Sequence, residues 1–342
     1  MAEKDTLILA IESSCDDTSA AICKNESILS NVIANQKVHE QYGGVVPELA
    51  SRAHMKHILP VVQTALDGAG VELKQLDAIA FTKGPGLLGS LLVGVSFGKA
   101  LGLALNKPLI DVNHMYAHVL AHFIDDEEKE KPGFPFICLT VSGGHTQLIL
   151  VRDYLDMEII GTTLDDAAGE AFDKIAKLLG FQYPGGPFID KHAKSGNPDK
   201  FSFSKPRIDG FNYSFSGLKT SVMNFLNKEI QKDSDFIAKN LDDLCASVQK
   251  TIIDILLDKL VKAIQKYEVQ DIAIAGGVSA NSGLRNAVSQ LGIQYKLGVH
   301  VPKFEYCTDN AAMIAITGKY MYERKMFSDQ SISASARLPF RP

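Results

Sequence analysis

Two histidines four residues apart, His114 and His118, are the residues of this sequence best suited to chemistry. On an α-helix this spacing places both imidazoles on one face, one turn apart. Helical zinc sites hold one ion in this way, although chance also produces such pairs on solvated helices. Asp309, at the start of another predicted helix, would add a carboxylate. Two imidazoles and one carboxylate leave coordination positions open for a substrate, as a catalytic metal requires.

The segment before the histidine pair indicates how the pair would be positioned. Residues 108–112 (Pro-Leu-Ile-Asp-Val) are apolar and predict a strand that ends in a polar turn just before His114. In open α/β sheets, functional sites gather at the carboxyl ends of strands. His122 lies four residues beyond His118, at the same spacing, and could be mistaken for a ligand.

Two glycine turns could bind an anion through backbone N–H groups. Ser142-Gly143-Gly144 has no Cβ atoms at its two glycines to block a close approach. Gly276-Gly277, ahead of Ser279 and Asn281, could do the same at the start of a helix. Either turn alone could be an ordinary turn. Together, at matching places in two halves of the chain, they predict a bound nucleotide.

Two further segments have a structural and a functional interpretation. Residues 165–174 carry acids at helical spacing, which favours either a solvated helix start or a carboxylate directed at ribose hydroxyls. Residues 183–187 (Tyr-Pro-Gly-Gly-Pro) predict a rigid loop that could lie flat against a base or a sugar.

A basic and aromatic stretch, residues 200–219, is a candidate nucleic-acid contact. Aromatic rings stack on unpaired bases while cations hold phosphates, but the same rings could pack in a core instead. Its members are Lys200, Phe201, Phe203, Lys205, Arg207, Phe211, Tyr213, Phe215 and Lys219. A second small cationic cluster comprises Arg52, His54, Lys56 and His57.

The order of predicted elements indicates a duplicated α/β architecture. A strand, a small polar turn and a second strand occur at residues 6–11, 12–18 and 19–23, and again at 136–141, 142–146 and 147–151. Each half later has a strand, a glycine turn and a helix, at residues 78–81, 84–86 and 86–105, and at 271–275, 276–281 and 284–291. Apolar residues at helical spacing over 244–264 predict a long core helix before the strand at residues 271–275.

The breaks in this pattern predict two lobes. Residues 125–133 are charged and end in Pro-Gly, as an exposed linker would. We therefore expect an N-terminal lobe of residues 1–132 plus 310–342, in which the C-terminal helix packs back, and a C-terminal lobe of residues 133–309.

Composition is that of an ordinary globular protein, with 342 residues, 46% hydrophobic and 22% charged. The net charge of −5 provides no global attraction for nucleic acid, so any such contact must be local. The five cysteines have no CxxC spacing, which favours free thiols in a reducing compartment. No secretory signal is apparent, and residues 86–105, with five glycines and Lys99, predict a buried core helix rather than a membrane span. We expect a cytoplasmic protein.

Motifs in order along nearly the whole chain resemble those of the TsaD family. This bacterial family makes N6-threonylcarbamoyladenosine in tRNA and was formerly classed as O-sialoglycoprotein endopeptidases. The similar runs are residues 12–16 (Glu-Ser-Ser-Cys-Asp), 43–52, 84–87, the pair His114 and His118, 141–147, 165–174, 183–187, 214–219, 275–281 and 307–312. One departure is Asp17, where the family usually has glutamate.

The resemblance implies a fold and a set of ligands. The fold would be a duplicated actin-like, Hsp70-like α/β fold of the sugar-kinase superfamily, with an active-site cleft between the lobes. One divalent ion, Fe²⁺ first and Zn²⁺ second, would be held by His114, His118 and Asp309. The adenylate substrate would lie against Thr140, Val141, Ser142, Gly143, Gly144, Asp173, Gly186, Asp190 and Asn281.

The resemblance also implies an activity and partners. The chain would transfer the threonylcarbamoyl group from threonylcarbamoyl-AMP to N6 of the adenosine 3′-adjacent to the anticodon, in tRNAs reading ANN codons, releasing AMP. A TsaB-like paralogous dimer partner and a TsaE-like ATPase would assist, and a separate enzyme would supply the adenylate. Asp16, Asp17 and His145 are the candidates for the general base.

Other classes of function fit the sequence less well. An ATPase or nucleotide-binding subunit would share the fold but would not need the histidine pair. A zinc endopeptidase would use the pair, but Met115 stands where the H-E-x-x-H motif has its glutamate. There is no G-x-S-x-G motif, so a serine hydrolase is not supported.

Overall fold

The computed structural model describes residues 5–36, 39, 42, 44–126 and 129–340. Gly43 of the predicted family motif, and Glu127 and Glu128 of the predicted linker, lie outside the described residues. The chain divides into two compact units. The first comprises Met1–Lys131, Asp153–Met157 and Pro302–Pro342, and the second comprises Pro132–Arg152 and Glu158–Val301. This division differs from the expected lobes mainly in assigning residues 302–309, and with them Asp309, to the first unit.

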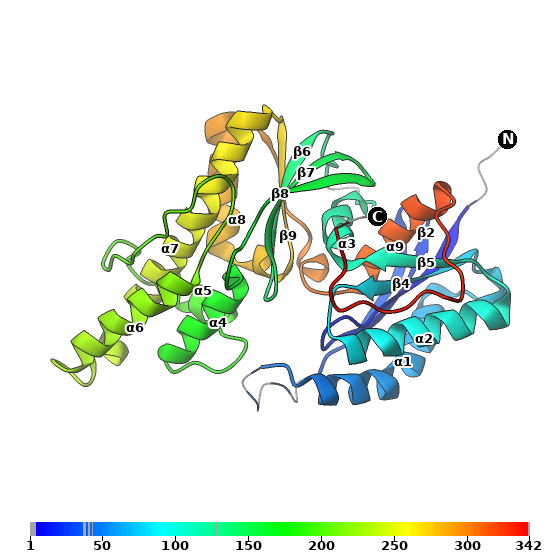
Figure 1. Cartoon of the computed structure of the whole chain (residues 1–342), viewed down its shortest axis with the longest axis horizontal. Helices are drawn as coiled ribbons and strands as arrows, with labels where there is room; N and C mark the ends of the chain where they lie inside the picture. Colours follow the sequence, from blue (N-terminus) through cyan, green and yellow to red (C-terminus); the bar gives the residue numbers. More distant parts are fainter. Residues whose placement is uncertain (1–4, 37–38, 40–41, 43, 127–128, 341–342) are drawn as a thin grey trace. The chain divides into compact units, whose positions relative to one another are not determined.

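The first unit is built on a five-stranded sheet of order β3-β2-β1-β4-β5 (Figure 1). Its strands are β1 (Leu7–Glu12), β2 (Thr18–Lys24), β3 (Ser27–Ala34), β4 (Ala78–Gly84) and β5 (Leu109–Asn113). Its helices are α1 (Pro47–Ala69), η2 (Leu73–Gln75), α2 (Leu88–Leu105), α3 (His114–Leu120), η3 (Ala121–Phe123), η5 (Phe304–Tyr306) and α9 (Ala311–Glu323).

The second unit is built on a five-stranded sheet of order β10-β9-β6-β7-β8. Its strands are β6 (Phe136–Val141), β7 (Thr146–Asp153), β8 (Asp156–Thr162), β9 (Asp271–Ala275) and β10 (Gly298–His300). Its helices are α4 (Ala168–Leu178), α5 (Gly186–Ala193), α6 (Ser216–Ile230), α7 (Phe236–Tyr267), η4 (Gly277–Ala280) and α8 (Ser282–Tyr295). The β7–β8 hairpin tip, Asp153–Met157, belongs by its contacts to the first unit.

The two sheets have the same topology, which confirms the predicted duplication. In the first, β1 pairs with β2 antiparallel and with β4 parallel; in the second, β6 pairs with β7 antiparallel and with β9 parallel. Read from opposite ends, the strand orders correspond one to one, with β5 and β10 as the last parallel strands. Strands β6 and β9 have the predicted bounds. The edge strands β3 and β8 were not predicted.

The first unit has helices on both faces of its sheet (Figure 1). On one face Leu9, Ile11 and Phe81 join the core formed with α1 and α2. On the other face α9 packs so closely that a Cβ at Gly318 would lie 2.8 Å from that of Ala80. The sheet is therefore buried on both faces, which explains its nearly continuous apolar strands.

Helix α2 is the predicted apolar helix, but only one of its faces is buried. Its small residues recur every four positions and meet the sheet: a Cβ at Gly98 would lie 2.6 Å from the Phe81 ring. The opposite face exposes Leu88, Leu92 and Leu103, the last at 70%. The prediction of a buried core helix is thus correct for one face. Among the described helices, α2 also has the length and composition of a membrane span, with 33% of it buried.

The predicted linker is anchored to the first unit. Lys131 lies 2.5 Å from the Glu26 carboxylate, and the Asp125 N–H donates to the Glu26 carbonyl at 2.9 Å. Lys319 and the Tyr320 hydroxyl of α9 bind the same carboxylate at 3.0 and 2.8 Å. One carboxylate in the β2–β3 turn thus fixes the end of the chain segment that leaves this unit.

Candidate functional site

The histidine pair lies where β5 passes directly into α3. Asn113 ends the strand and caps the helix, since its side-chain oxygen accepts from the Met115 N–H at 2.9 Å. His114 is therefore the first helical residue and His118 follows one turn later. Their ring centroids lie 4.7 Å apart at 86°. Both side chains are buried.

Asp309 reaches the pair from the turn before α9. Asn310 caps that helix by accepting from the Met313 N–H at 3.1 Å, which fixes the backbone next to Asp309. Asp309 Oδ1 lies 3.3 Å from His114 Nε2 and 3.2 Å from His118 Nε2. The structure thus brings together the three residues that sequence analysis selected, all within the first unit.

A fourth residue, Glu12, completes the cluster and was not predicted as a site residue. Its carboxylate is fully buried at the end of β1, where Oε2 lies 3.0 Å from His114 Nδ1 and accepts from the Thr82 hydroxyl at 2.6 Å. Oε1 accepts from the Ser14 N–H. Its sequence signal is an acid directly after a run of five apolar residues. Such a carboxylate holds the imidazole so that Nε2 is left to face Asp309.

The charges of the cluster oppose the effect of burial. Burial disfavours every charged form here, but the carboxylates of Asp309 and Glu12 raise the pKa of His114 well above its usual range. The His114 and His118 imidazoles in turn hold the pKa of Asp309 well below that of an ordinary aspartate. Burial lowers the pKa of His118, so that imidazole is neutral at pH 7 and can act as a ligand.

The donor set fits a divalent metal ion. Neither ring nitrogen of the buried His118 has a hydrogen-bond partner within the described chain, although Nε2 lies 3.2 Å from Asp309 Oδ1. Buried polar atoms are rarely left in this state. Ligands about 2.0–2.2 Å from one ion lie about 3–3.5 Å apart, and Asp309 Oδ1 lies at such a distance from both Nε2 atoms. Among the described residues, the group whose ligand atoms lie close enough to hold one ion contains His114, His118 and Asp309, and not His122.

The Ser142–Gly144 turn in the second unit connects β6 to β7. The Ser142 N–H donates to the His145 carbonyl at 2.8 Å, and the His145 N–H donates to the Ser142 hydroxyl at 3.1 Å. A Cβ built on Gly143 or Gly144 would have no atom within 4 Å. The turn is therefore rigid at its base and open at its glycines. Thr140 and Val141 precede it on β6 and are buried.

The other predicted substrate residues lie on α4 (Asp173), on α5 (Gly186 and Asp190) and at the start of α8 (Asn281), and two glycines bring α4 and the turn after β9 close to β6. Gly169 of α4 approaches so closely that a Cβ there would lie 2.5 Å from the Ser142 carbonyl oxygen. Gly276 adopts φ +83°, and a Cβ there would lie 2.5 Å from the Val141 carbonyl oxygen. Only glycine allows these approaches. They bring the start of α4 and the turn after β9 against the end of β6.

Asp173, Asp190 and Asn281 organise loops. Asp173 Oδ1 accepts from the Gly185 and Gly186 N–H groups at 2.7 and 3.2 Å, and burial raises its pKa. Asp190 Oδ1 accepts from the N–H and hydroxyl of Ser282 at 3.1 and 2.8 Å. Asn281 caps α8 and donates to Gln249 at 2.7 Å. Each of these three side chains thus forms a hydrogen bond that fixes a neighbouring loop or helix start.

The candidates for the general base lie in both units. Asp16 and Asp17 follow the β1 end in the first unit, and His145 starts the β7 side of the turn in the second. Burial, together with the charges of Asp16 and Asp309, raises the pKa of Asp17 to about 7. Its Oδ1 accepts from Asn35 at 3.0 Å.

Several other predicted features have structural roles. Asp165 binds Ser214 and the Phe215 N–H, and Asp166 pairs with Lys174 at 2.8 Å. Asp165, Asp166 and Asp173 of the acidic run are therefore all held in helix and loop contacts. His54 is buried and bonded to Thr18 and the Cys15 carbonyl, so the predicted cationic cluster loses one member to the core.

The aromatic rings of residues 200–219 also pack in a core. Phe203, Tyr213 and Phe215 are at most 5% exposed and belong to the core of the second unit. The interpretation that these rings stack on bases is therefore wrong for these three, because the helices around them bury their faces. The cations of the stretch remain at the surface.

Comparison with known proteins agrees with this geometry. The family model TsaD, tRNA N6-adenosine threonylcarbamoyltransferase, matches residues 27–316. The protein of that name from Christiangramia forsetii is 58% identical over 99% of this chain and 100% of its own length. That from Phocaeicola vulgatus is 60% identical over 93% of this chain and 94% of its own.

Among solved structures, HypF from T. kodakarensis has a TM-score of 0.61 at 15% identity, covering 94% of this chain and 48% of that chain. It shares the actin-like ATPase fold, which confirms the expected fold class, and it carries no further argument at this identity. The match to the curated relatives extends over nearly the whole length of both chains. The chain therefore belongs to the TsaD family of tRNA N6-adenosine threonylcarbamoyltransferases.

Proposed function

We propose that His114, His118 and Asp309 hold the divalent metal ion on which the TsaD family depends, iron(II) first and zinc second. The single observation that carries this proposal is the buried, unpartnered His118 beside a carboxylate shared with His114. Two nitrogens and one oxygen suit either ion. An ion bound there would supply positive charge to the oxygens of the threonylcarbamoyl adenylate.

Glu12 and Thr82 serve as positioning residues for this centre. Glu12 accepts from His114 Nδ1, which presents Nε2 toward Asp309, and Thr82 fixes the Glu12 carboxylate in turn. This arrangement sets the ring orientation before any substrate binds.

The Ser142–Gly144 turn would bind the phosphate of the adenylate. Its glycines are open to a ligand, and the His145–Ser142 hydrogen bonds keep the turn in one conformation. Backbone N–H groups then meet the phosphate at no steric cost. Asp173, Gly186, Asp190 and Asn281 would bind the nucleoside. Asp173 holds the N–H of Gly186 at the start of α5, and Asp190 holds the N–H of Ser282, the residue after Asn281.

The reaction joins N6 of a tRNA adenosine to the carbamoyl carbon. The new C–N bond forms as the C–O bond to AMP breaks, and the amine loses a proton to a base. That amine is a poor nucleophile, because its lone pair is delocalised into the ring. Asp17, with a pKa of about 7, has the proton affinity that a general base needs at neutral pH. Asp16 and His145 are the alternatives.

Partners complete the proposal. We propose a TsaB-like paralogue as dimer partner, a TsaE-like ATPase as an assisting protein, and a separate enzyme as the source of the adenylate. The exposed apolar residues Met55 and Leu59 of α1 and Leu92 and Leu103 of α2 give the first unit a surface suited to a partner. The substrate tRNA indicates action in the cytoplasm, away from a membrane.

The test is transfer with all components supplied. The full chain, the partner proteins, threonylcarbamoyl-AMP and unmodified tRNA are incubated, and the digested tRNA is analysed for threonylcarbamoyladenosine by mass spectrometry. His114→Ala should abolish the product, and the matched control His122→Ala should retain it. Near-normal product from His114→Ala would contradict the metal role, and no product from the wild type beside an active relative would contradict the proposed reaction.

A further inference from the structure

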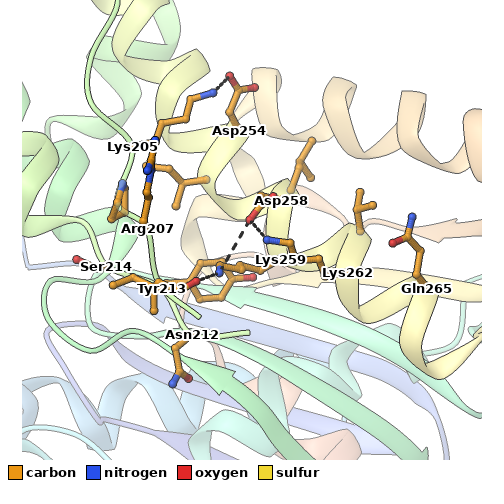
Figure 2. Close-up of a pocket in the computed structure, with 15 residues that line it drawn as sticks. Lys205, Arg207, Asn212, Tyr213, Ser214, Asp254, Asp258, Lys259, Lys262 and Gln265 are labelled. Atoms are coloured by element: carbon orange, nitrogen blue, oxygen red, sulfur yellow. Dashed lines mark hydrogen bonds and ion pairs between the residues drawn. The ribbon is translucent and has the colours of Figure 1, made fainter. Parts of the chain in front are cut away.

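A groove in the second unit is separate from the residues discussed so far. It has a volume of about 810 Å³ and lies between α7 and the loop of residues 205–214 (Figure 2). Lys205 and Arg207 line it from the loop, and Asp254, Asp258, Lys259 and Lys262 line it from α7.

The groove carries an excess of positive charge. Lys205 and Lys250 share the Asp254 carboxylate at 2.8 and 3.0 Å, and Lys262 binds that of Asp258 at 2.8 Å. Lys259 Nζ is 3.9 Å from the same Asp258 carboxylate. Among the residues that line the groove, four cations, Lys205, Arg207, Lys259 and Lys262, therefore stand against two carboxylates, Asp254 and Asp258.

Arg207 is the cation that is available to a ligand. Its side chain is exposed, and within the described residues it has no hydrogen bond or ion pair. A guanidinium offers five N–H donors in a planar fork that matches two oxygens of a phosphate. Figure 2 shows Arg207 on the loop side of the groove, across from the α7 side chains.

The loop that carries Arg207 is held from below. The Lys259 side chain is 7% exposed, and its ammonium donates to the carbonyls of Ile208 and Gly210, the latter at 3.0 Å. The buried Tyr213 hydroxyl donates to the Leu256 carbonyl at 3.4 Å. Both contacts fix the loop to α7, so the groove is preformed and a ligand would pay little to order it.

One end of the groove is connected to the turn proposed to bind the adenylate. Ser214 lines the groove and donates to Asp165 at 2.5 Å. Asp165 lies just before α4, whose Gly169 N–H donates to the Ser142 carbonyl at 3.2 Å. A chain molecule with one nucleotide near that turn could therefore continue toward the groove within the same unit.

We infer that this groove binds the phosphate backbone of the tRNA, an inference that rests on the proposed function. Because the chain has a net charge of −5, the polyanion needs a local positive surface. The aromatic ring among the described residues that line the groove, Tyr213, is buried, so it offers no face on which a base could stack. The contact is therefore with phosphates and is independent of base sequence.

The experiment measures tRNA binding and transfer with the full chain and its partner proteins, over a series of salt concentrations. Arg207→Glu removes the unpaired cation, Arg207→Lys keeps its charge, and Lys228→Glu reverses an exposed lysine of α6 outside the groove. We expect Arg207→Glu to weaken tRNA binding about 3- to 10-fold and to reduce the salt slope by about 1. It should raise KM for tRNA while KM for the adenylate stays at the wild-type value.

Arg207→Lys should recover most of the tRNA affinity, and Lys228→Glu should behave as the wild type. Equal effects of Arg207→Glu and Lys228→Glu on tRNA affinity and salt slope would overturn the inference. So would weakened association with the partner proteins at unchanged tRNA affinity, which would assign the groove to an acidic protein surface. Absence of product from the wild type would instead count against the proposed function, because tRNA affinity is measured independently.

Discussion

Glu12 Oε2 lies 3.0 Å from His114 Nδ1, so the end of the first strand holds the ring that begins the third α-helix. The carboxylate is fully buried and is also bonded to Thr82 on the neighbouring strand. Two strands and a helix therefore determine one imidazole orientation. This relationship gives the proposed metal centre a rigid support that the spacing of the histidines does not reveal.

Glu12→Gln should weaken metal binding about 10- to 100-fold, because an amide oxygen is a poorer acceptor for the His114 N–H than a carboxylate. Titration of the metal-free protein with zinc, followed by calorimetry, measures the change. Glu48→Gln, at an exposed carboxylate of α1, is the matched control. Equal affinities for the two variants would remove Glu12 from the metal centre.

His118→Leu and His114→Leu should both lose the metal but should differ in stability. In the presence of a chelator, His118→Leu should change the free energy of unfolding by less than about 1 kcal/mol, because its buried nitrogens make no hydrogen bond and Asp309 keeps its contact with His114. His114→Leu should lose about 3 kcal/mol, because it leaves the Glu12 carboxylate buried without its partner. Urea denaturation compares them; equal losses would contradict the assigned contacts.

Glu26 should make the first unit sensitive to acid. Burial opposes its charge, but hydrogen bonds from Lys131, Tyr320 and Lys319 lower its pKa from 4.5 to about 2. Because the folded pKa is depressed, its contribution is complete above pH 4.5 and is lost as the pH falls to about 2.

At pH 7, Glu26→Gln should lower the unfolding free energy by about 1–2 kcal/mol, allowing for screening of this partly exposed group. The difference from the wild type should shrink between pH 4.5 and 2. Thermal denaturation over this range tests it. Glu48→Gln, whose ion pair with Arg52 is exposed, should change stability by less than about 0.5 kcal/mol.

Two glycine substitutions should distinguish a glycine needed for packing in the core from a glycine needed for the approach of a ligand. Gly98→Ala places a Cβ 2.6 Å from the Phe81 ring and should cost about 1–3 kcal/mol of stability. Gly143→Ala meets nothing within 4 Å and should leave stability nearly unchanged while it lowers transfer activity. Chemical denaturation and the transfer assay give both values. Full activity in Gly143→Ala would argue against phosphate binding by its turn.

Periodicity and turn residues predicted the repeated strands because buried strands such as residues 136–141 are apolar throughout. The edge strand β3 was missed because none of its residues is fully buried and Ser27, Ser30 and Asn31 interrupt its apolar residues, so that it resembles a loop. The three metal ligands could be predicted because they stand where strands end and helices start, and residues such as Asn113 mark these places in the sequence. Glu12 was missed because its role depends on a partner about a hundred residues away, and no local pattern records that contact.

For the rings at residues 203, 213 and 215, the sequence offered a function that the tertiary structure excludes. Basic and aromatic residues in one stretch are compatible with either a nucleic-acid surface or a core. Only the packing of α4, α6 and α7 around the rings decides between them. Exposure of individual side chains is a property of the tertiary structure.

The assignment of residues 302–342 to the first unit has a consequence for synthesis on the ribosome. His114 and His118 emerge early, but Asp309 and the buried helix α9 follow only after the whole second unit has been translated. Until then the nascent first sheet lacks the helix that covers one of its faces, and the histidine pair lacks its carboxylate. An ion captured at this centre would therefore mark a chain that has been completed, since a truncated product ending within the second unit has only two of the three ligands.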